Sequence, residues 1–168
     1  MSYGVKYISR FQSEYVEFEY EVKISERGYS GTAMQRNLGG TPVLIKDSSG
    51  VISGTSLELL IETAHDGDLR EFYTEDNKKF RVDVFRDGSL YWTGFIVTEK
   101  YAESMVPHAD ITITATDGLG LLKKVDYTLT GKHPVLEIIK YCTDKTGLTL
   151  GYQVNAGVEC RNFKRGCC

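Results

Sequence analysis

Apolar and polar side chains alternate strictly in the first part of the chain. From Glu14 to Ile24 every second residue is apolar, and the residues between them are mostly glutamate. A period of two residues is typical of a β-strand with one buried face and one solvated face. The apolar set is Val16, Phe18, Tyr20, Val22 and Ile24, and the polar set is Glu17, Glu19, Glu21 and Lys23.

Two shorter apolar segments follow, at Val43–Lys46 and Ser56–Thr63. We expect a strand in each, joined by the turn-forming Asp47–Gly50. The preceding stretch, Ser25–Gly40, is polar and rich in glycine, which leaves a turn, a short strand or a long loop open. In the second segment the inward positions are predicted to be Leu57, Leu59 and Ile61.

The clearest local pattern is a β-hairpin between residues 79 and 98. Lys79–Arg86 and Leu90–Thr98 flank Asp87-Gly88-Ser89, and Asp-Gly is a dipeptide that tight hairpins favour. Alternation along the second arm predicts one face with Leu90, Trp92, Gly94 and Ile96 and another with Tyr91, Thr93, Phe95 and Val97. Because both faces are largely apolar, we expect one of them to pack on something besides the core of this sheet.

The last third of the chain predicts one more strand and a helix. Asp110–Thr116 alternates again, and Asp117 is placed to cap a helical turn over Leu119–Lys124. A helix is predicted from Pro134 to about Lys145, because proline suits the first helical position and Gly147 provides a stop. The apolar stripe of that helix is Val135, Ile138, Ile139 and Cys142.

These elements predict an α+β protein that is mainly β, with an antiparallel barrel-like or sandwich-like sheet and a C-terminal helix. We expect a β module over residues 1–126. Residues 127–154 would hold the helix and a final strand, either within the same domain or at the start of a second one. Residues 155–168 carry no apolar period and are predicted to be an irregular tail.

Composition narrows the function classes. The chain has 168 residues with a formal net charge of −3, so it has no excess of positive charge to hold phosphates, and nucleic-acid binding is not expected. No apolar run approaches the roughly 18 residues of a spanning helix, and the N-terminus lacks the layout of a secretion signal, so we expect a soluble protein without membrane insertion. The four cysteines, Cys142, Cys160, Cys167 and Cys168, lack zinc-site spacing and are expected to be reduced thiols.

No pattern predicts catalysis, a metal or a cofactor. His65, His108 and His133 are scattered without acidic or cysteine partners at ligand spacing. No nucleophile motif is present, and the glycine pairs lack phosphate-loop context. The glutamate row is interpreted as a solvated face or one that meets basic residues of a partner. We therefore expect a protein that is not an enzyme, with no catalytic, metal or cofactor residues.

The hairpin and the segment that follows it carry a resemblance. In order, Phe80–Val97 contains a strand, a short turn and a strand with Trp-x-Gly-x-Ile, and Ile111–Leu122 ends in Ala-x-Asp-Gly-Leu-x-x-Leu. This ordered set resembles the hub and tail-tip proteins of tailed phages and prophages, particularly those of Bacteroides-type hosts. The similarity covers roughly residues 55–145. Family hubs are usually longer, which fits an N-terminal module or a prophage remnant.

The resemblance implies a structural role in the virion tail, assembled in a bacterial cytoplasm. Hub modules commonly form trimers, so the expected partners are copies of the chain itself and other tail proteins such as the tube, tape-measure or spike. Candidate interface residues are Tyr91, Phe95, Val97 and Phe85. The family offers no catalytic residues to carry over onto this region.

Two other hypotheses stay open. A carbohydrate-binding or host-surface-binding β module would use Tyr91, Phe95 and neighbouring rings for stacking on a glycan. Alternatively, the chain is the non-catalytic N-terminal part of a tail-associated peptidase or cell-wall hydrolase.

Overall fold

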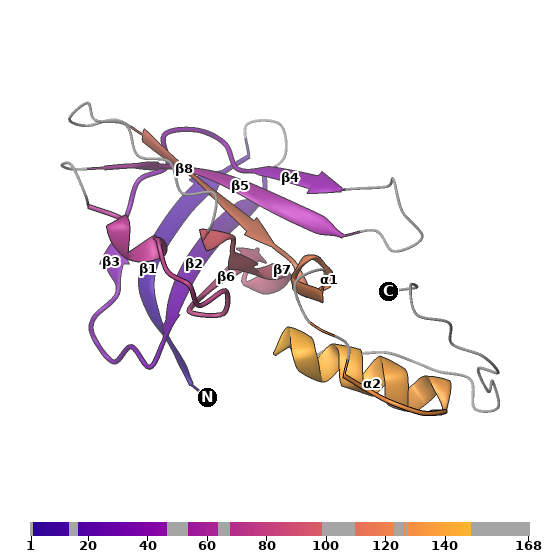
Figure 1. Cartoon of the computed structure of the whole chain (residues 1–168). Helices are drawn as coiled ribbons and strands as arrows, with labels where there is room; N and C mark the ends of the chain where they lie inside the picture. The colour runs from indigo at the N-terminus through magenta and orange to yellow at the C-terminus, as the bar shows by residue number, and fades with distance from the viewer. Residues whose placement is uncertain are drawn as a thin grey trace.

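The computed structural model describes residues 2–13, 17–46, 54–63, 68–98, 110–122, 126 and 128–148. Its strands form one eight-stranded sheet in the order β3-β1-β2-β6-β7-β8-β5-β4 (Figure 1). The elements are β1 (Tyr3–Gln12), β2 (Glu19–Arg27), β3 (Met34–Gln35), β4 (Val43–Lys46), β5 (Thr55–Glu62), the 3₁₀ turn η1 (Arg70–Phe72), β6 (Phe80–Arg86), β7 (Ser89–Ile96), β8 (Asp110–Thr116), α1 (Gly118–Leu122) and α2 (Val135–Thr146).

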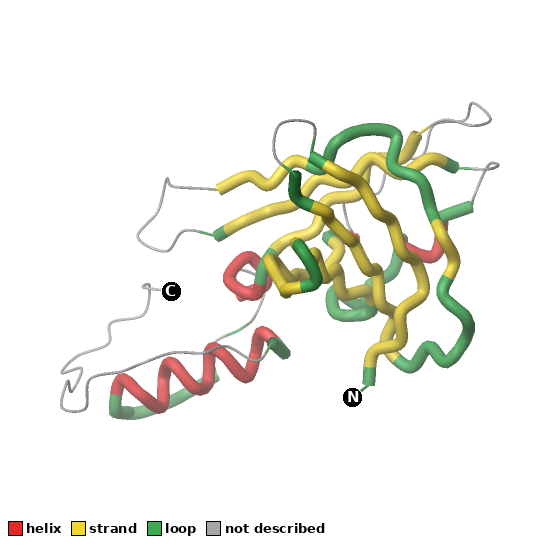
Figure 2. Tube along the Cα trace, turned by 180° about the vertical axis from the view of Figure 1, so that it is seen from behind, coloured by secondary structure: helices red, strands yellow, loops and turns green. Residues whose placement is uncertain are grey.

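The mainly β, α+β fold class is confirmed. The sheet is mixed rather than wholly antiparallel, because β3 runs parallel to β1 while the other paired strands are antiparallel. It also curls without closing into a barrel, as Figure 2 shows from behind. The final strand predicted over Leu148–Val154 lies outside the described residues except for Leu148, and the predicted tail at 155–168 lies outside them entirely.

The two ends of the curled sheet are linked by the short segment 34–39. The backbone N–H of Arg36 donates to the carbonyl of Ile8 in β1 at 2.9 Å. On the other side, Asn37 accepts from Glu62 at 3.1 Å and Gly39 donates to Leu60 at 2.9 Å, both in β5. The two bonds to β5 form one isolated antiparallel bridge between Leu38 and Ile61, in place of the continuous ladder that a closed barrel has.

The core lies inside the curl, where the alternating positions of the strands meet. The inward positions predicted from alternation are buried in three strands, so these predictions are confirmed. They are Leu57, Leu59 and Ile61 of β5, Ile111, Ile113 and Ala115 of β8, and Val22 and Ile24 of β2. The first strand was not predicted. Within β1 the buried positions are Tyr7 and Ser9, and a register shift between Val5 and Tyr7 interrupts the period. A buried serine and a bulge remove the apolar alternation on which a strand prediction depends.

The predicted hairpin is confirmed as β6 and β7. Its two turn residues, Asp87 and Gly88, have φ values of 48° and 76°, the pair of positive angles that a type I′ turn requires. The strand predicted from Glu14 begins at Glu19 and extends to Arg27, while residues 14–16 lie outside the described residues.

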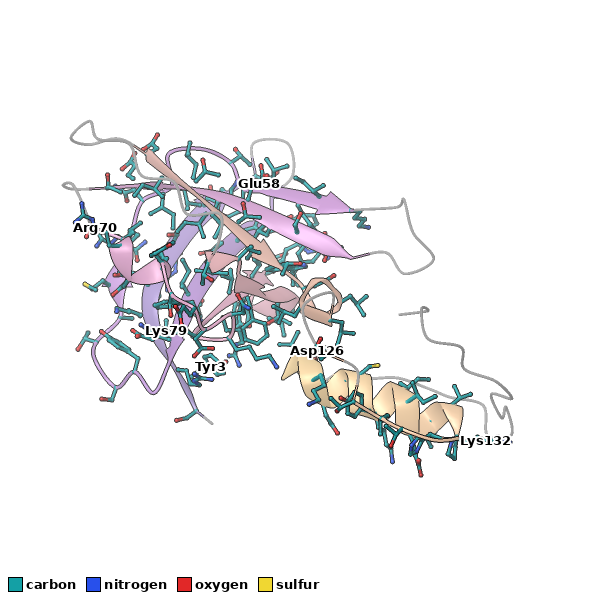
Figure 3. The ribbon with its side chains drawn as sticks, viewed as in Figure 1. Tyr3, Glu58, Arg70, Lys79, Asp126 and Lys132 are labelled. Atoms are coloured by element: carbon teal, nitrogen blue, oxygen red, sulfur yellow. The ribbon has the colours of Figure 1, made fainter. Side chains whose placement is uncertain are left out.

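The helix predicted near the C-terminus is α2, which projects away from the sheet. Pro134 precedes its first residue, and Gly147 ends it in the left-handed region with φ 73°. Figure 3 shows Asp126 near α1 and Lys132 at the end of α2 that lies away from the sheet, so α2 begins at that end and runs back toward the sheet. At the C-terminal end of α2 the Lys78 ammonium donates to the carbonyl of Lys145.

A chain of hydrogen bonds connects β7, β5 and α1. The Trp92 indole Nε1 donates to Thr55 Oγ1 at 2.9 Å, and that hydroxyl donates to Asp117 Oδ2 at 2.7 Å. The same carboxylate accepts from the Thr55 N–H at 2.6 Å, and its Oδ1 accepts from the Gly120 N–H at 3.0 Å. The predicted capping role of Asp117 is therefore confirmed.

Gly94 lies at the same junction. A Cβ at Gly94 would collide with the Thr116 carbonyl and with the Trp92 ring, so the close approach of β7 to β8 requires glycine. The residues of the two sequence motifs thus meet in one place, where they fix how the strands join.

Replacing Asp117 with alanine is expected to lower the free energy of unfolding by about 1–3 kcal/mol, because the part-buried Thr55 and Gly120 N–H groups lose their acceptor. Urea unfolding followed by circular dichroism measures the change. Asp144→Ala, which removes an exposed carboxylate of α2, is the control and should change stability by less than about 0.5 kcal/mol. Equal effects of the two substitutions would contradict the role assigned to Asp117.

Candidate functional site

A pocket of about 280 Å³ lies between the C-terminal end of β1, the start of β2, the start of β4 and the middle of the sheet. Its lining residues are Phe11, Gln12, Ser13, Tyr20, Thr41, Pro42, Leu44, Leu57, Val84, Tyr91 and Trp92. The core residues Leu57, Val84 and Trp92 are buried, whereas the residues of the opposite wall are half-buried or exposed. The pocket is therefore the place where the curled sheet leaves its core accessible.

Aromatic rings make up one wall of the pocket. Phe11 and Tyr20 stack with ring centroids 5.0 Å apart and planes 5° from parallel. Tyr91 meets Tyr20 edge-on at 6.3 Å, and the Arg86 guanidinium lies 4.8 Å from the Tyr91 ring. These contacts restrict the rings to few rotamers, so the wall is largely formed before anything binds.

A β-bulge places Tyr91 at this wall. Val84 pairs with Trp92 and Phe85 pairs with Leu90, which leaves Tyr91 as an extra residue without a partner in β6. The expected alternation is therefore wrong at the start of β7, because a bulge turns its extra residue away from the regular face. Leu90, expected inward beside Trp92, is 57% exposed.

The candidate interface residues do not form one surface. Tyr91 is 49% exposed at the pocket, but Phe95 is 0% exposed and lies 6.3 Å from the Tyr3 ring. Phe85 is half-buried under the Lys23 ammonium at 4.4 Å, and Val97 is half-buried with its N–H bonded to Thr114. The expectation that Phe95 faces outward is wrong, because its side chain is fully buried and its ring packs near the Tyr3 ring of β1. Figure 3 shows Tyr3 at the start of β1.

A cluster of charged and polar side chains, separate from the pocket, lies along β1. The Lys6 ammonium binds Glu26 at 2.8 Å and Glu71 at 2.5 Å, and the Tyr7 hydroxyl donates to Glu71 at 2.6 Å. Burial, then the bond to Glu71, raises the pKa of Tyr7 to about 12. Burial alone lowers the pKa of Lys6, but Glu26 and Glu71 outweigh it and raise that pKa to about 12. Each group is satisfied by its neighbours, which is typical of a structural network.

Arg36 extends this network to the segment that links β1 and β5. Its guanidinium makes two bonds of 2.8 Å to the Asp68 carboxylate and lies 5.2 Å from the Tyr7 ring. A bidentate pair of this kind fixes both position and orientation. The cluster therefore holds the two ends of the sheet together.

Side chains that could bind a metal ion do not gather into one site in the described part of the chain. His133 contacts Glu137 at 3.0 Å and the Thr130 carbonyl at 2.9 Å, while His65 and His108 lie outside the described residues. Among the described residues, no group of three or more His, Cys, Asp or Glu side chains is arranged to hold a metal ion. No described helix has the length and apolar character that crossing a membrane requires.

Comparison with protein-family models, with curated proteins and with solved structures finds no match for this chain.

The Lys6–Tyr7 network makes stability sensitive to alkaline pH. Both groups hold their protons more tightly in the folded chain, with pKa values near 12 against ordinary values of 10.5 and 10.0, so their contribution is complete below pH 10 and is lost as pH rises toward 12. Urea unfolding at about pH 9 and about pH 11 should show a fall in stability that is smaller in Tyr7→Phe. The exposed-site variant Tyr73→Phe should keep the full fall, and an unchanged fall in Tyr7→Phe would contradict the assignment.

The burial of Phe95 distinguishes it from Tyr91. Phe95→Asp is expected to unfold the chain or to destabilise it by more than about 3 kcal/mol, because a carboxylate would replace a fully buried ring. Tyr91→Asp should remain folded, because half of that side chain is exposed. Thermal unfolding by circular dichroism compares them, and a stable Phe95→Asp variant would overturn the assigned burial.

Proposed function

We propose that the chain is a structural module of a phage tail tip or baseplate hub, acting by assembly with copies of itself and with other tail proteins. The motif resemblance in the hairpin and in the segment after it supports this role. The places of the motif residues are consistent with it, because Trp92, Gly94 and Asp117 join strands to one another. A module selected for assembly needs such a rigid frame.

The observation that carries the proposal is the free edge of the sheet at β4. Among the described residues β4 pairs only with β5, and two of its four residues, Val43 and Ile45, are 53% and 42% exposed. An edge strand presents unpaired N–H and C=O groups, and exposed β-branched side chains beside them favour pairing with another chain. β4 is therefore the best placed strand for extending the sheet into a second subunit.

The test is molar mass by light scattering over a concentration series, with a reductant present so that cysteine oxidation does not link subunits. The unmodified chain is expected to form a trimer or a larger ring. A strict monomer at every concentration would contradict self-assembly.

A charge at the edge should disrupt that assembly. Val43→Lys is expected to weaken association at least tenfold, about 1.4 kcal/mol, because an ammonium would replace an apolar contact. The substitution should preserve the fold, since Val43 lies directly opposite Glu58, which Figure 3 shows on β5.

Thr112→Lys is the matched control, because it adds the same charge at an exposed position of β8, away from the edge. It should leave the mass distribution unchanged. If Val43→Lys and the control behave alike, β4 is not the contact.

A further inference from the structure

The pocket has the size of a single small ring. Its volume of about 280 Å³ lies just below the range of roughly 300–1,000 Å³ that holds drug-sized ligands. Its buried floor is Trp92, flanked by Leu57 and Val84, and its rim carries the polar side chains of Gln12, Ser13 and Thr41. An occupant with an apolar face and a polar periphery would match both surfaces.

The described lining residues exclude a charged occupant. None of them is an aspartate, glutamate, lysine, arginine or histidine. Arg86 stands outside the lining and is held between the Tyr91 and Phe18 rings, each 4.8 Å away. A charged ligand would lose its hydration in the pocket without gaining a partner, and a nucleotide would lack cations for its phosphate.

The rim argues against a purely apolar occupant, such as a leucine side chain of a protein partner. Such a side chain would cover Gln12, Ser13 and Thr41 without offering hydrogen bonds, and an unpaired buried polar group costs about 1–3 kcal/mol. A pyranose presents C–H groups that pack on an aromatic ring and hydroxyl groups around its edge. The stacked pair of Phe11 and Tyr20 and the edge-on Tyr91 supply the rings for that contact.

From this combination we propose that the pocket binds one uncharged pyranose ring of a saccharide. The aromatic wall of Phe11, Tyr20 and Tyr91 and the Trp92 floor contact the sugar, and the polar rim orients its hydroxyl groups. The floor is fixed in advance, because the Trp92 indole is bonded to Thr55 and through it to Asp117. This binding site does not depend on the proposed self-assembly.

Trp92 is the only tryptophan of the chain and lines the pocket, so its fluorescence reports on occupancy. The probes are methyl β-D-glucopyranoside, methyl β-D-galactopyranoside, methyl α-D-mannopyranoside and N-acetyl-D-glucosamine. At least one should give a saturable change in emission, with a dissociation constant on the order of 1 mM. Sodium methyl β-D-glucopyranosiduronate, in which a carboxylate replaces the C6 hydroxymethyl group of the glucoside, should bind at least tenfold more weakly than the neutral sugars that bind.

Two neighbouring variants separate the pocket wall from the general surface. Tyr91→Ala should weaken sugar binding at least tenfold, whereas Leu90→Ala, exposed but outside the lining, should bind as the unmodified chain does. Thermal unfolding confirms that both are folded, and light scattering confirms that the titrations compare the same oligomer.

Two results would overturn the proposal. The first is no saturable response to any of the four neutral sugars. The second is equal weakening by Tyr91→Ala and Leu90→Ala.

Discussion

The series of hydrogen bonds from Trp92 through Thr55 to Asp117 reinforces a short strand pairing in the middle of the sheet. β7 and β8 are in register over only two residue pairs, Phe95 with Thr116 and Ile96 with Ala115. One further backbone bond, from the Val97 N–H to the Thr114 carbonyl at 2.8 Å, extends this short contact. The indole and the carboxylate reach across from both sides to one threonine of β5, so three strands and the start of α1 share one set of bonds.

The same bonds determine what the pocket can be. The N–H of a tryptophan at the edge of a core usually finds a hydrogen-bond partner, and that bond fixes the orientation of the ring. Here Thr55 fixes the indole, so the ring lines a pocket with a defined floor. At the far side of the sheet, the pairing of Arg36 with Asp68 holds the segment that links β1 and β5. Together the two interactions keep the sheet curled but open.

The sequence was informative where one face of a strand is buried. Leu57, Leu59 and Ile61 occupy every second position because one side of β5 faces the core, and the Asp-Gly turn marks the hairpin for a purely local reason. β1 was not predicted because the inward position of Ser9 is polar and a register shift between Val5 and Tyr7 interrupts the period of two. Its place between β2 and β3 is set by long-range pairing, which no local period encodes.

The candidate site was predicted only in part, and for a related reason. Tyr91 was identified as a functional aromatic residue, but a bulge in β7 moves it from a regular sheet face to the pocket. Phe95 was expected beside it, yet it is covered by Tyr3, more than ninety residues earlier in the chain. Neither the extra residue of a bulge nor a distant strand covering a face leaves a signal in the hairpin's own alternation.

The proposed edge and the proposed pocket share one short strand. In β4 the exposed Val43 and Ile45 alternate with Leu44, which lines the pocket together with Thr41 and Pro42 just before it. Among the described residues β4 pairs on one side only, so it is the least constrained wall of the pocket, whereas Trp92 and Tyr20 are held by central strands. Pairing of β4 with a second copy would order the backbone that carries Leu44. Assembly at the edge would then lower the entropic cost of filling the pocket, and an occupied pocket would in turn favour assembly by the same free energy.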